Sequence, residues 1–309
     1  MPHREQRRRA AGRLVSHRRL IGPGAVVRVI APSGPFDPEA FAAGLAFLRE
    51  RYEVRHRPDV LDRRGYLAGS DERRLAELRE ALADPDALAV VAARGGYGAT
   101  RLLEHLDAAD LPPKVLVGFS DITALHALWQ RGGRPSLHAS MVAALGRADE
   151  VARSAWVLAL EGGAALFTGL RCWSPGVATG PLVGGNLAVL AALVGTPYAP
   201  PLDGSLLLLE DVGERPYRLD RMLTSLRHAG WLDRVAGVVV GELTDCRAGP
   251  DGVEALAVLE EHLARLPVPV VHAIPVGHGP RNAPIWMGVR YRLDAGAGSL
   301  TPIGDSVRP

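Results

Sequence analysis

In the first half of the chain, short and mostly apolar runs alternate with amphipathic segments. The runs cover residues 25–31, 88–93 and 114–119, and each ends at a serine, glycine or proline turn. Apolar positions at helical spacing predict helices over 38–51, 71–84, 99–107 and 122–133. Ser70 stands where an N-cap is expected. Buried strands alternating with helices are typical of a doubly wound parallel sheet, so we predict an α/β fold for residues 22–145.

The pattern changes after residue 145. Residues 146–178 contain one helical pattern and then a turn-rich stretch, which we interpret as a linker. Residues 179–309 are rich in glycine and proline and predict a second, smaller, β-rich α/β domain. Its apolar runs cover 205–210, 235–243 and 267–277, with helical patterns between them. The arginine-rich residues 1–21 have no apolar core of a secretion signal, and we interpret them as a disordered basic extension or a start placed too early.

Composition and charge narrow the possible functions. Hydrophobic residues make up 47% and charged residues 23%, as in ordinary folded proteins. The net charge is only +2 and aromatic residues are 5%, so we expect no nucleic-acid partner. No stretch of about 18 apolar residues occurs, so we expect no membrane partner either. The two cysteines lack the spacing of a disulfide framework or a metal knuckle, no H-E-x-x-H is present, and we expect neither metal nor cofactor.

The strongest local signal for chemistry is the segment VLVGFSDITALHAL. A buried strand there delivers Ser120 to a sharp turn before a helix, which exposes the hydroxyl near backbone N–H groups. The pattern G-F-S-D is not the G-x-S-x-G of α/β-hydrolases, because Ile122 replaces the second glycine. Ser120 is therefore either a nucleophile or the N-cap of the following helix.

A serine nucleophile needs a base and an acid that orients the base. His278 lies in the Gly-Pro loop PVGHGPRNAP, and its alternative role is a loop histidine bonded to backbone. Three acids, Glu210, Asp211 and Glu214, follow the apolar run that begins at Ser205, and spacing alone does not choose among them. The glycines of RGGYG follow a strand, where they supply N–H groups to an oxyanion or cradle a phosphate.

These segments together resemble the LD-carboxypeptidase family of serine peptidases, which includes muramoyltetrapeptide carboxypeptidases and microcin C immunity peptidases. The resemblance covers residues 24–295 in family order. The matching stretches are VRVIAPSGP, ARGGYGATRLL, KVLVGFSDITALH, GPLVGGNLAVLAALVGTPY, LLLLEDVGERPYRLDRML, VAGVVVGEL and PVGHGPRNAPIWMG.

The resemblance implies a fold and a catalytic triad without metal or cofactor. The fold is an N-terminal flavodoxin-like domain that carries the serine and a C-terminal domain that carries the acid and the histidine. Ser120 is implied as nucleophile, Glu210 as the orienting acid and His278 as the base. A triad divided between domains implies that domain docking, or a homodimer that steadies it, sets the catalytic distances.

The resemblance also implies the surroundings of the triad. The backbone N–H of Asp121 and one from Gly95 or Gly96 are implied as the oxyanion hole. Tyr97, Asn186 and Arg218 are candidate substrate contacts, with a purely structural role as the alternative for each.

The implied reaction is hydrolysis of an amide between an L-centre and a C-terminal D-residue. The expected case is release of D-Ala from cytoplasmic murein tetrapeptides during cell-wall recycling. Two alternatives stay open, hydrolysis of a peptidyl-nucleotide amide and a non-catalytic two-domain protein that binds a small ligand.

Overall fold

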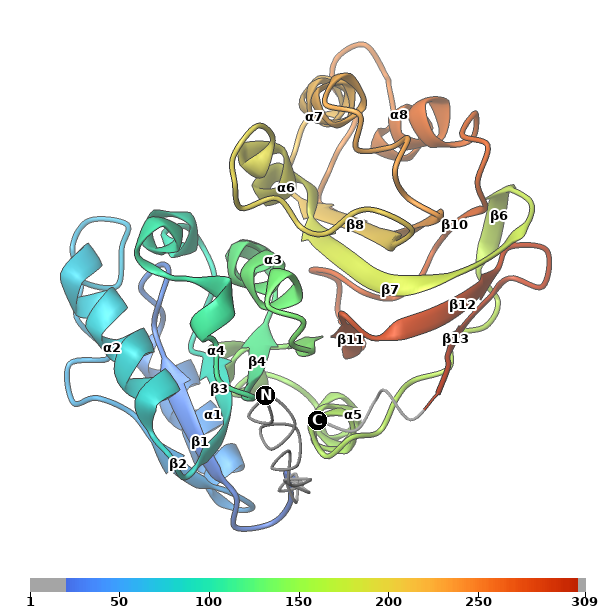
Figure 1. Cartoon of the computed structure of the whole chain (residues 1–309). Coiled ribbons are helices and arrows are strands. Elements are labelled where there is room, and N and C mark those ends of the chain that lie inside the picture. The colour runs from blue at the N-terminus through green and yellow to red at the C-terminus, as the bar shows by residue number, and fades with distance from the viewer. Residues whose placement is uncertain (1–20, 305–309) are drawn as a thin grey trace, which may run out of the picture.

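The computed structural model describes residues 21–304 and divides into two α/β halves, each built on its own sheet (Figure 1). The predicted basic extension therefore lies, apart from Ile21, outside the described residues. Within residues 21–304 no helix is long and apolar enough to cross a membrane.

The first sheet has five parallel strands in the spatial order β2-β1-β3-β4-β5, with β11 antiparallel at its edge. This is the strand order of flavodoxin-like folds, so the prediction of a flavodoxin-like parallel sheet is confirmed. The strands are β1 (Val26–Ile30), β2 (Glu53–Arg55), β3 (Ala87–Ala92), β4 (Val115–Gly118), β5 (Ser136–His138) and β11 (Ile285–Met287).

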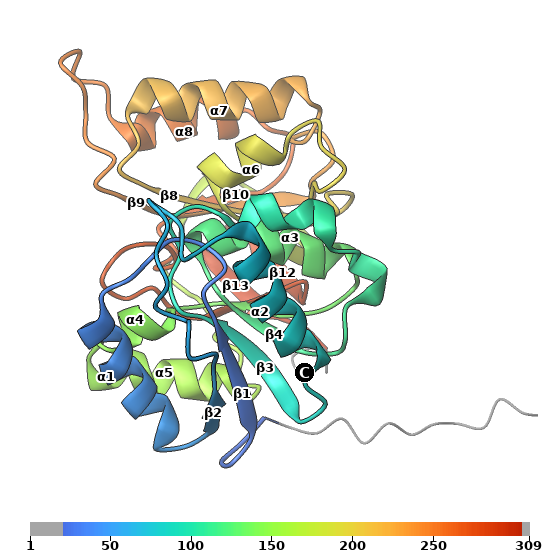
Figure 2. The ribbon, with the colours of Figure 1, turned by 90° about the vertical axis from the view of Figure 1, so that its left-hand side faces the viewer.

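Helices cover both faces of this sheet (Figures 1 and 2). Apolar side chains of α1, α4 and α5 share one core with Val27 and Val29 of β1, whereas those of α2 and α3 share a second core with Ile30. These helices are α1 (Pro38–Arg49), α2 (Asp71–Ala83), α3 (Thr123–Arg131), α4 (Val142–Leu145) and α5 (Glu150–Leu160). Ser70 caps α2 as predicted, because its side chain accepts the N–H of Arg73 at 3.2 Å.

The second sheet has seven strands in the order β13-β12-β7-β8-β9-β10-β6. Its centre, β7 to β10, is parallel, and antiparallel strands flank it on both sides. The strands are β6 (Arg171–Ser174), β7 (Val177–Asn186), β8 (Leu206–Val212), β9 (Gly237–Thr244), β10 (Val270–His272), β12 (Arg290–Asp294) and β13 (Ser299–Pro302). Figure 2 shows three helices together on one side of it, α6 (Leu187–Leu193), α7 (Pro216–His228) and α8 (Ala255–Leu263).

One predicted helix has a different form in the structure. Residues 99–105 form a 3-10 helix, η1 (Ala99–His105), and not an α-helix. Its first N–H, that of Ala99, is bound by the carboxylate of Asp121. Residues 146–178, predicted as a linker with one helix, contain α5, which packs in the core of the first half, and β6, which pairs with β10.

Strand β11 joins the halves. It follows the loop that contains His278 and crosses back to pair with β5 of the first sheet, with Ile285 opposite His138. Trp286 of this strand is buried, and its indole N–H donates to the carbonyl of Gly163 at 3.1 Å. The histidine loop is therefore anchored a few residues downstream to the sheet that carries Ser120.

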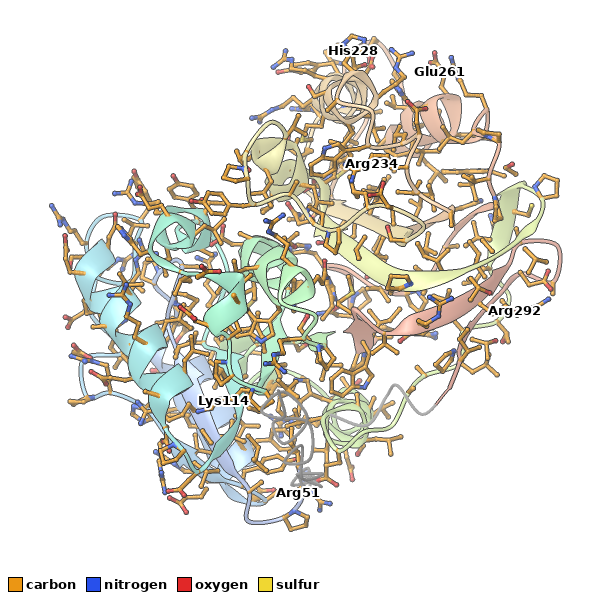
Figure 3. The ribbon with its side chains drawn as sticks, in the orientation of Figure 1. Arg51, Lys114, His228, Arg234, Glu261 and Arg292 are labelled. Carbon is orange, nitrogen blue, oxygen red and sulfur yellow. The ribbon has the colours of Figure 1, made fainter. Side chains whose placement is uncertain are left out.

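Charged side chains lie mostly on the outside. His228, Arg234, Glu261 and Arg292, labelled in Figure 3, are all exposed. Lys114, also labelled in Figure 3, is the only lysine of the chain and lies at the amino end of β4, where its ammonium donates to the carbonyl of Ala81 at 2.9 Å. Ser120 follows the opposite end of the same strand, so Lys114 is outside the candidate site.

Candidate active site

Ser120 lies at the carboxyl edge of the first sheet, directly after β4 and Phe119. Its φ of 63° falls in the left-handed region, which is strained for a residue with a side chain. Residues Ser120–Ile122 form a single 3-10 turn, η3, that leads into α3. No side-chain hydrogen bond caps either helix, so capping does not explain Ser120.

Gly95 packs directly against Ser120. A Cβ at position 95 would lie 3.1 Å from Ser120 Cβ and 3.3 Å from Ser120 Oγ, so a larger residue would displace the serine. Among the hydrogen bonds of residues 21–304, the N–H groups of Gly95 and Gly96 have no acceptor. Gly95, the residue with one of these two unbound N–H groups, therefore lies directly beside the Ser120 hydroxyl.

Asp121 connects the serine turn to the glycine loop. Its carboxylate is buried and accepts the N–H of Ala99, the residue after Gly98, at 2.8 Å. Burial raises the pKa of this carboxyl, while the Ala99 hydrogen bond opposes the shift. The Asp121 side chain therefore fixes the loop, whereas its backbone N–H is the group predicted for the oxyanion.

The second half contributes an acid and a histidine in direct contact. Glu210 Oε2 lies 2.7 Å from His278 Nδ1, and the glutamate is fully buried. The pairing of β8 with β9 shifts between Leu209 and Asp211, so Glu210 sits at an irregularity of the kind that re-aims a side chain. A carboxylate on Nδ1 fixes the proton there and leaves Nε2 as a proton acceptor.

The Phe119 ring packs against the His278 imidazole of this Glu-His pair. Its centroid lies 4.8 Å from that of the His278 imidazole, and Phe119 immediately precedes Ser120. The structure thus places the Glu-His pair of one half against the residue that precedes Ser120 in the other half. Within the described residues no hydrogen bond joins Ser120 Oγ to His278.

The structure gives a separate partner to each of the three acids that the sequence left open. Glu210 contacts His278, whereas Glu214 forms an ion pair with Arg218 at 3.1 Å. Asp211 accepts the N–H of Ala188 in the first turn of α6 at 2.9 Å. Burial, with Glu210 adjacent, raises the pKa of Asp211 to about 6. Of the three acids, only Glu210 contacts His278.

The three candidate substrate contacts have different environments. Tyr97 is 46% exposed, with its ring centroid 5.9 Å from that of Tyr66. Arg218 is exposed on α7 beside Glu214. Asn186 is buried, and its amide accepts the N–H of Val189 at 3.1 Å and donates to Asp211 at 3.0 Å. Tyr97 and Arg218 remain accessible to a ligand, whereas both amide atoms of Asn186 already have partners within the chain.

Two residues that sequence reasoning did not single out bind the histidine loop. Glu242 Oε2 accepts the N–H of Gly279 at 2.8 Å, and Asn282 Oδ1 accepts that of Gly277 at 3.3 Å. Both residues occur inside the stretches that carry the family resemblance, VAGVVVGEL and PVGHGPRNAPIWMG. Their place inside these stretches was the only sign in the sequence that pointed to Glu242 and Asn282.

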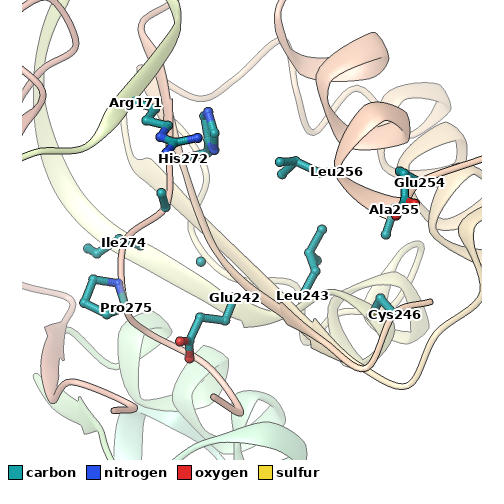
Figure 4. A pocket seen from close by; sticks show the side chains of 12 residues that line it. Arg171, Glu242, Leu243, Cys246, Glu254, Ala255, Leu256, His272, Ile274 and Pro275 are labelled. Carbon is teal, nitrogen blue, oxygen red and sulfur yellow. The ribbon is translucent and has the colours of Figure 1, made fainter. Parts of the chain in front are cut away.

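A cavity of about 550 Å³ lies between the carboxyl ends of β9 and β10 and the start of α8 (Figure 4). Polar side chains in its lining are Arg171, Glu242, Glu254 and His272. Ser120, Glu210 and His278 are not part of the lining, so the cavity is separate from the candidate triad. Glu242 lines the cavity and also accepts the N–H of Gly279, the residue after His278. In residues 21–304 no group of three or more His, Cys, Asp or Glu is arranged to hold a metal.

Comparison with known proteins identifies the family. The model of the LD-carboxypeptidase N-terminal domain matches residues 27–139, and that of the LD-carboxypeptidase C-terminal domain matches residues 179–293. The chain belongs to the LD-carboxypeptidase family. The resemblance inferred from the sequence is thereby confirmed, and the activity of this family is that of a carboxypeptidase.

Relatives of this family member include a Streptomyces coelicolor protein provisionally named a carboxypeptidase, 44% identical over 296 residues and covering 91% of this chain and 94% of the relative. The murein tetrapeptide carboxypeptidase of Pseudomonas aeruginosa is 34% identical over 277 residues, covering 83% of this chain and 89% of the relative. The crystal structure of muramoyltetrapeptide carboxypeptidase from Oxalobacter formigenes has a TM-score of 0.78 and 31% identity, covering 89% of this chain and 97% of that one. The microcin immunity protein MccF in complex with glutamyl sulfamoyl guanosine has a TM-score of 0.83 at 18% identity, covers 93% of this chain and 99% of that one, and shares the fold.

Proposed function

We propose that this LD-carboxypeptidase is a serine peptidase that hydrolyses the amide between an L-centre and a C-terminal D-residue, and that its substrate is a murein tetrapeptide ending in D-Ala. The observation that carries the mechanism is the 2.7 Å contact between Glu210 and His278, with the imidazole packed on Phe119 beside Ser120. The substrate is inferred from the names of the relatives from Pseudomonas aeruginosa and Oxalobacter formigenes.

In the first step Ser120 Oγ attacks the carbonyl carbon of the L-residue. His278 Nε2 accepts the hydroxyl proton as the new C–O bond forms. The resulting imidazolium is stabilised by the Glu210 carboxylate on Nδ1. Because Glu210 is fully buried, this stabilisation acts in a medium that screens charge weakly.

Negative charge then develops on the carbonyl oxygen. The backbone N–H of Asp121 and one from Gly95 or Gly96 are the donors proposed to bind it, and the contact of Gly95 with Ser120 supports this role. Such donors need no reorganisation during the reaction, because Asp121 fixes the loop through Ala99.

The tetrahedral intermediate collapses by breaking the C–N bond. His278 gives its proton to the leaving amine, and the D-residue departs as a free amino acid. Water then attacks the acyl-serine, with His278 again accepting a proton, and Ser120 is regenerated. Accessible Tyr97 and Arg218 are proposed to contact the peptide, and Arg218 offers a cation for a carboxylate.

Digestion of a murein tetrapeptide, followed by mass spectrometry, tests the proposal. We expect loss of D-Ala with the wild type, in the presence or absence of EDTA, and no loss with Ser120→Ala. The matched peptide that ends in L-Ala should stay intact. Release that EDTA abolishes, or that Ser120→Ala retains, would contradict the proposal. Cleavage of a peptidyl-nucleotide amide in place of the tetrapeptide would favour the other substrate class.

The family resemblance further predicts a cytoplasmic location and a homodimer. In a homodimer the docking of the two halves would be steadied by the partner. Light scattering of the purified protein measures the mass in solution, and a monomer would contradict the homodimer.

A further inference from the structure

One residue of the second half, Glu242, holds the turn that carries His278 at both of its ends. The backbone N–H of Glu242 donates to the carbonyl of Val276 at 2.9 Å, and its Oε2 accepts the N–H of Gly279 at 2.8 Å. Glu242 therefore binds the turn of residues 276–279 at both ends, and His278 lies in sequence between the two bonded residues. The bond to Gly279 involves a charged acceptor, which makes it stronger than a neutral hydrogen bond.

The turn requires glycine on either side of His278. A Cβ on Gly279 would lie 2.2 Å from Glu242 Oε1, and the φ of Gly277 is 141°. A Cβ on Gly277 would lie 3.2 Å from the Cβ of Glu242 and 3.0 Å from Glu210 Oε2. The two glycines thus let the turn pack against two carboxylates. Glu210 contacts the imidazole of His278, and Glu242 accepts the backbone N–H of Gly279.

The charges around Glu242 match a role in holding the loop. Its carboxyl is half-buried, and burial with Glu210 nearby raises its pKa, whereas the Gly279 N–H, His278 and Arg281 oppose that shift. Burying a carboxylate costs free energy unless it is hydrogen-bonded, and the protein hydrogen bond of this carboxylate goes to the histidine turn. It forms no ion pair in the described part of the chain.

We propose that Glu242 is a positioning residue for His278. Its carboxylate fixes the backbone of Gly279, and so sets the imidazole at the distance and angle that Ser120 requires. This inference rests on the proposed function of Ser120, Glu210 and His278. Glu242 touches no reacting atom, so its removal should lower kcat and leave KM nearly unchanged.

The cavity beside Glu242 makes the proposal testable by chemical rescue. Glu242 is one of the lining residues, and in Figure 4 its side chain lies at the lower edge of the cavity, beside Pro275. In Glu242→Ala a small carboxylate such as formate can enter through the cavity and accept the Gly279 N–H in place of the missing side chain. Glu254 lines the same cavity without a hydrogen bond to the turn, so Glu254→Ala is the matched control.

The experiment measures D-Ala release from a murein tetrapeptide by wild type, Ser120→Ala, Glu242→Ala, Glu242→Gln and Glu254→Ala, each with and without formate. We expect Glu242→Ala to lose about 10- to 100-fold in kcat, because a misplaced base slows the chemical step. Formate should raise that rate several-fold and leave wild type and Glu254→Ala unchanged. Glu242→Gln should keep most of the activity, because its amide oxygen can still accept the Gly279 N–H.

Two results would overturn the proposal, namely full activity of Glu242→Ala, or a loss that formate does not restore in a variant with native circular dichroism. If Glu242→Ala does not fold, Gly279→Ala takes its place, because its Cβ displaces the Glu242 carboxylate. It should lose kcat without formate rescue, and full activity of this variant would overturn the proposal. Failure of the proposed function is distinguishable, because in that case wild type itself releases no D-Ala or Ser120→Ala still does.

Discussion

Glu210 Oε2 and His278 Nδ1 lie 2.7 Å apart although 68 positions separate the two residues in the chain. The contact joins a central strand of the second sheet to the loop that leads into β11, which belongs to the first sheet. A buried acid therefore reaches a histidine that is tied to the sheet of Ser120. In the proposed triad, this crossing strand within one chain therefore links His278 to the sheet that carries Ser120.

The contact predicts a large effect of Glu210→Gln on catalysis. The amide cannot neutralise an imidazolium and does not enforce the required tautomer, so kcat should fall about 10²- to 10⁴-fold, as for comparable triads. Steady-state kinetics on the tetrapeptide measure this. Glu261→Gln, on the exposed surface of α8, is the control and should behave as wild type. A loss below about threefold for Glu210→Gln would contradict its role.

The backbone strain at Ser120 predicts a difference in stability between two inactive variants. Glycine adopts a φ of 63° without strain, whereas alanine does not. Ser120→Gly should therefore be more stable than Ser120→Ala by about 1 kcal/mol in urea unfolding, while both lack activity. Equal midpoints and slopes would mean that the turn is not strained.

Burial of His126 predicts how stability depends on pH. Burial lowers the pKa of His126 to about 4, and its imidazole contacts the carbonyl of Gly118 at 2.9 Å and Ser136 Oγ at 2.7 Å. Between pH 6.5 and 4 the unfolded chain binds a proton that the folded chain excludes, so stability falls on acidification, by about 3 kcal/mol from this group.

His126→Gln isolates this contribution. Between pH 6.5 and 4 the free energy of unfolding of the variant should fall less than that of the wild type. Above pH 7 the free energies of unfolding of the two proteins should depend on pH equally. Urea unfolding at several pH values measures both slopes. Identical slopes would exclude His126 as a source of acid sensitivity.

Truncation of Trp286 tests the link between the halves. Its side chain is fully buried in β11, so Trp286→Ala should lower the free energy of unfolding by about 3–5 kcal/mol. It should also lower kcat, because β11 begins a few residues after His278. Leu256→Ala, at a position 41% exposed, is the control and should change stability by less than about 1 kcal/mol. A fall in stability without a fall in kcat would separate β11 from the site.

The sequence patterns predicted those parts of the fold that are long and uniformly apolar. Strands β1, β3 and β4 were recognisable because both of their faces are buried between helices. Strand β11 was not, because three residues carry no periodicity and its partner β5 lies about 150 positions earlier. Strand β7 was missed because glycines and a proline interrupt its apolar residues.

For the site, residue patterns and family resemblance contributed differently. The strand-turn-helix pattern pointed to Ser120, but only the resemblance separated Glu210 from Asp211 and Glu214. The residue types alone cannot tell which acid faces the histidine, because Glu210 makes this contact at an irregularity of β8 that carries no sequence signature. Glu242 was missed because its proposed role depends on a bond to the backbone of Gly279, which has no sequence signature.

Labelling with a phosphonylating serine reagent tests the coupling of Ser120 to His278 most directly. Intact-mass spectrometry of the wild type should show one adduct, which peptide mapping places on Ser120. In His278→Ala the rate of labelling of Ser120 should fall at least about 100-fold, because no base then accepts the proton of the Ser120 hydroxyl. Labelling of another residue, or an unchanged rate in His278→Ala, would contradict the account.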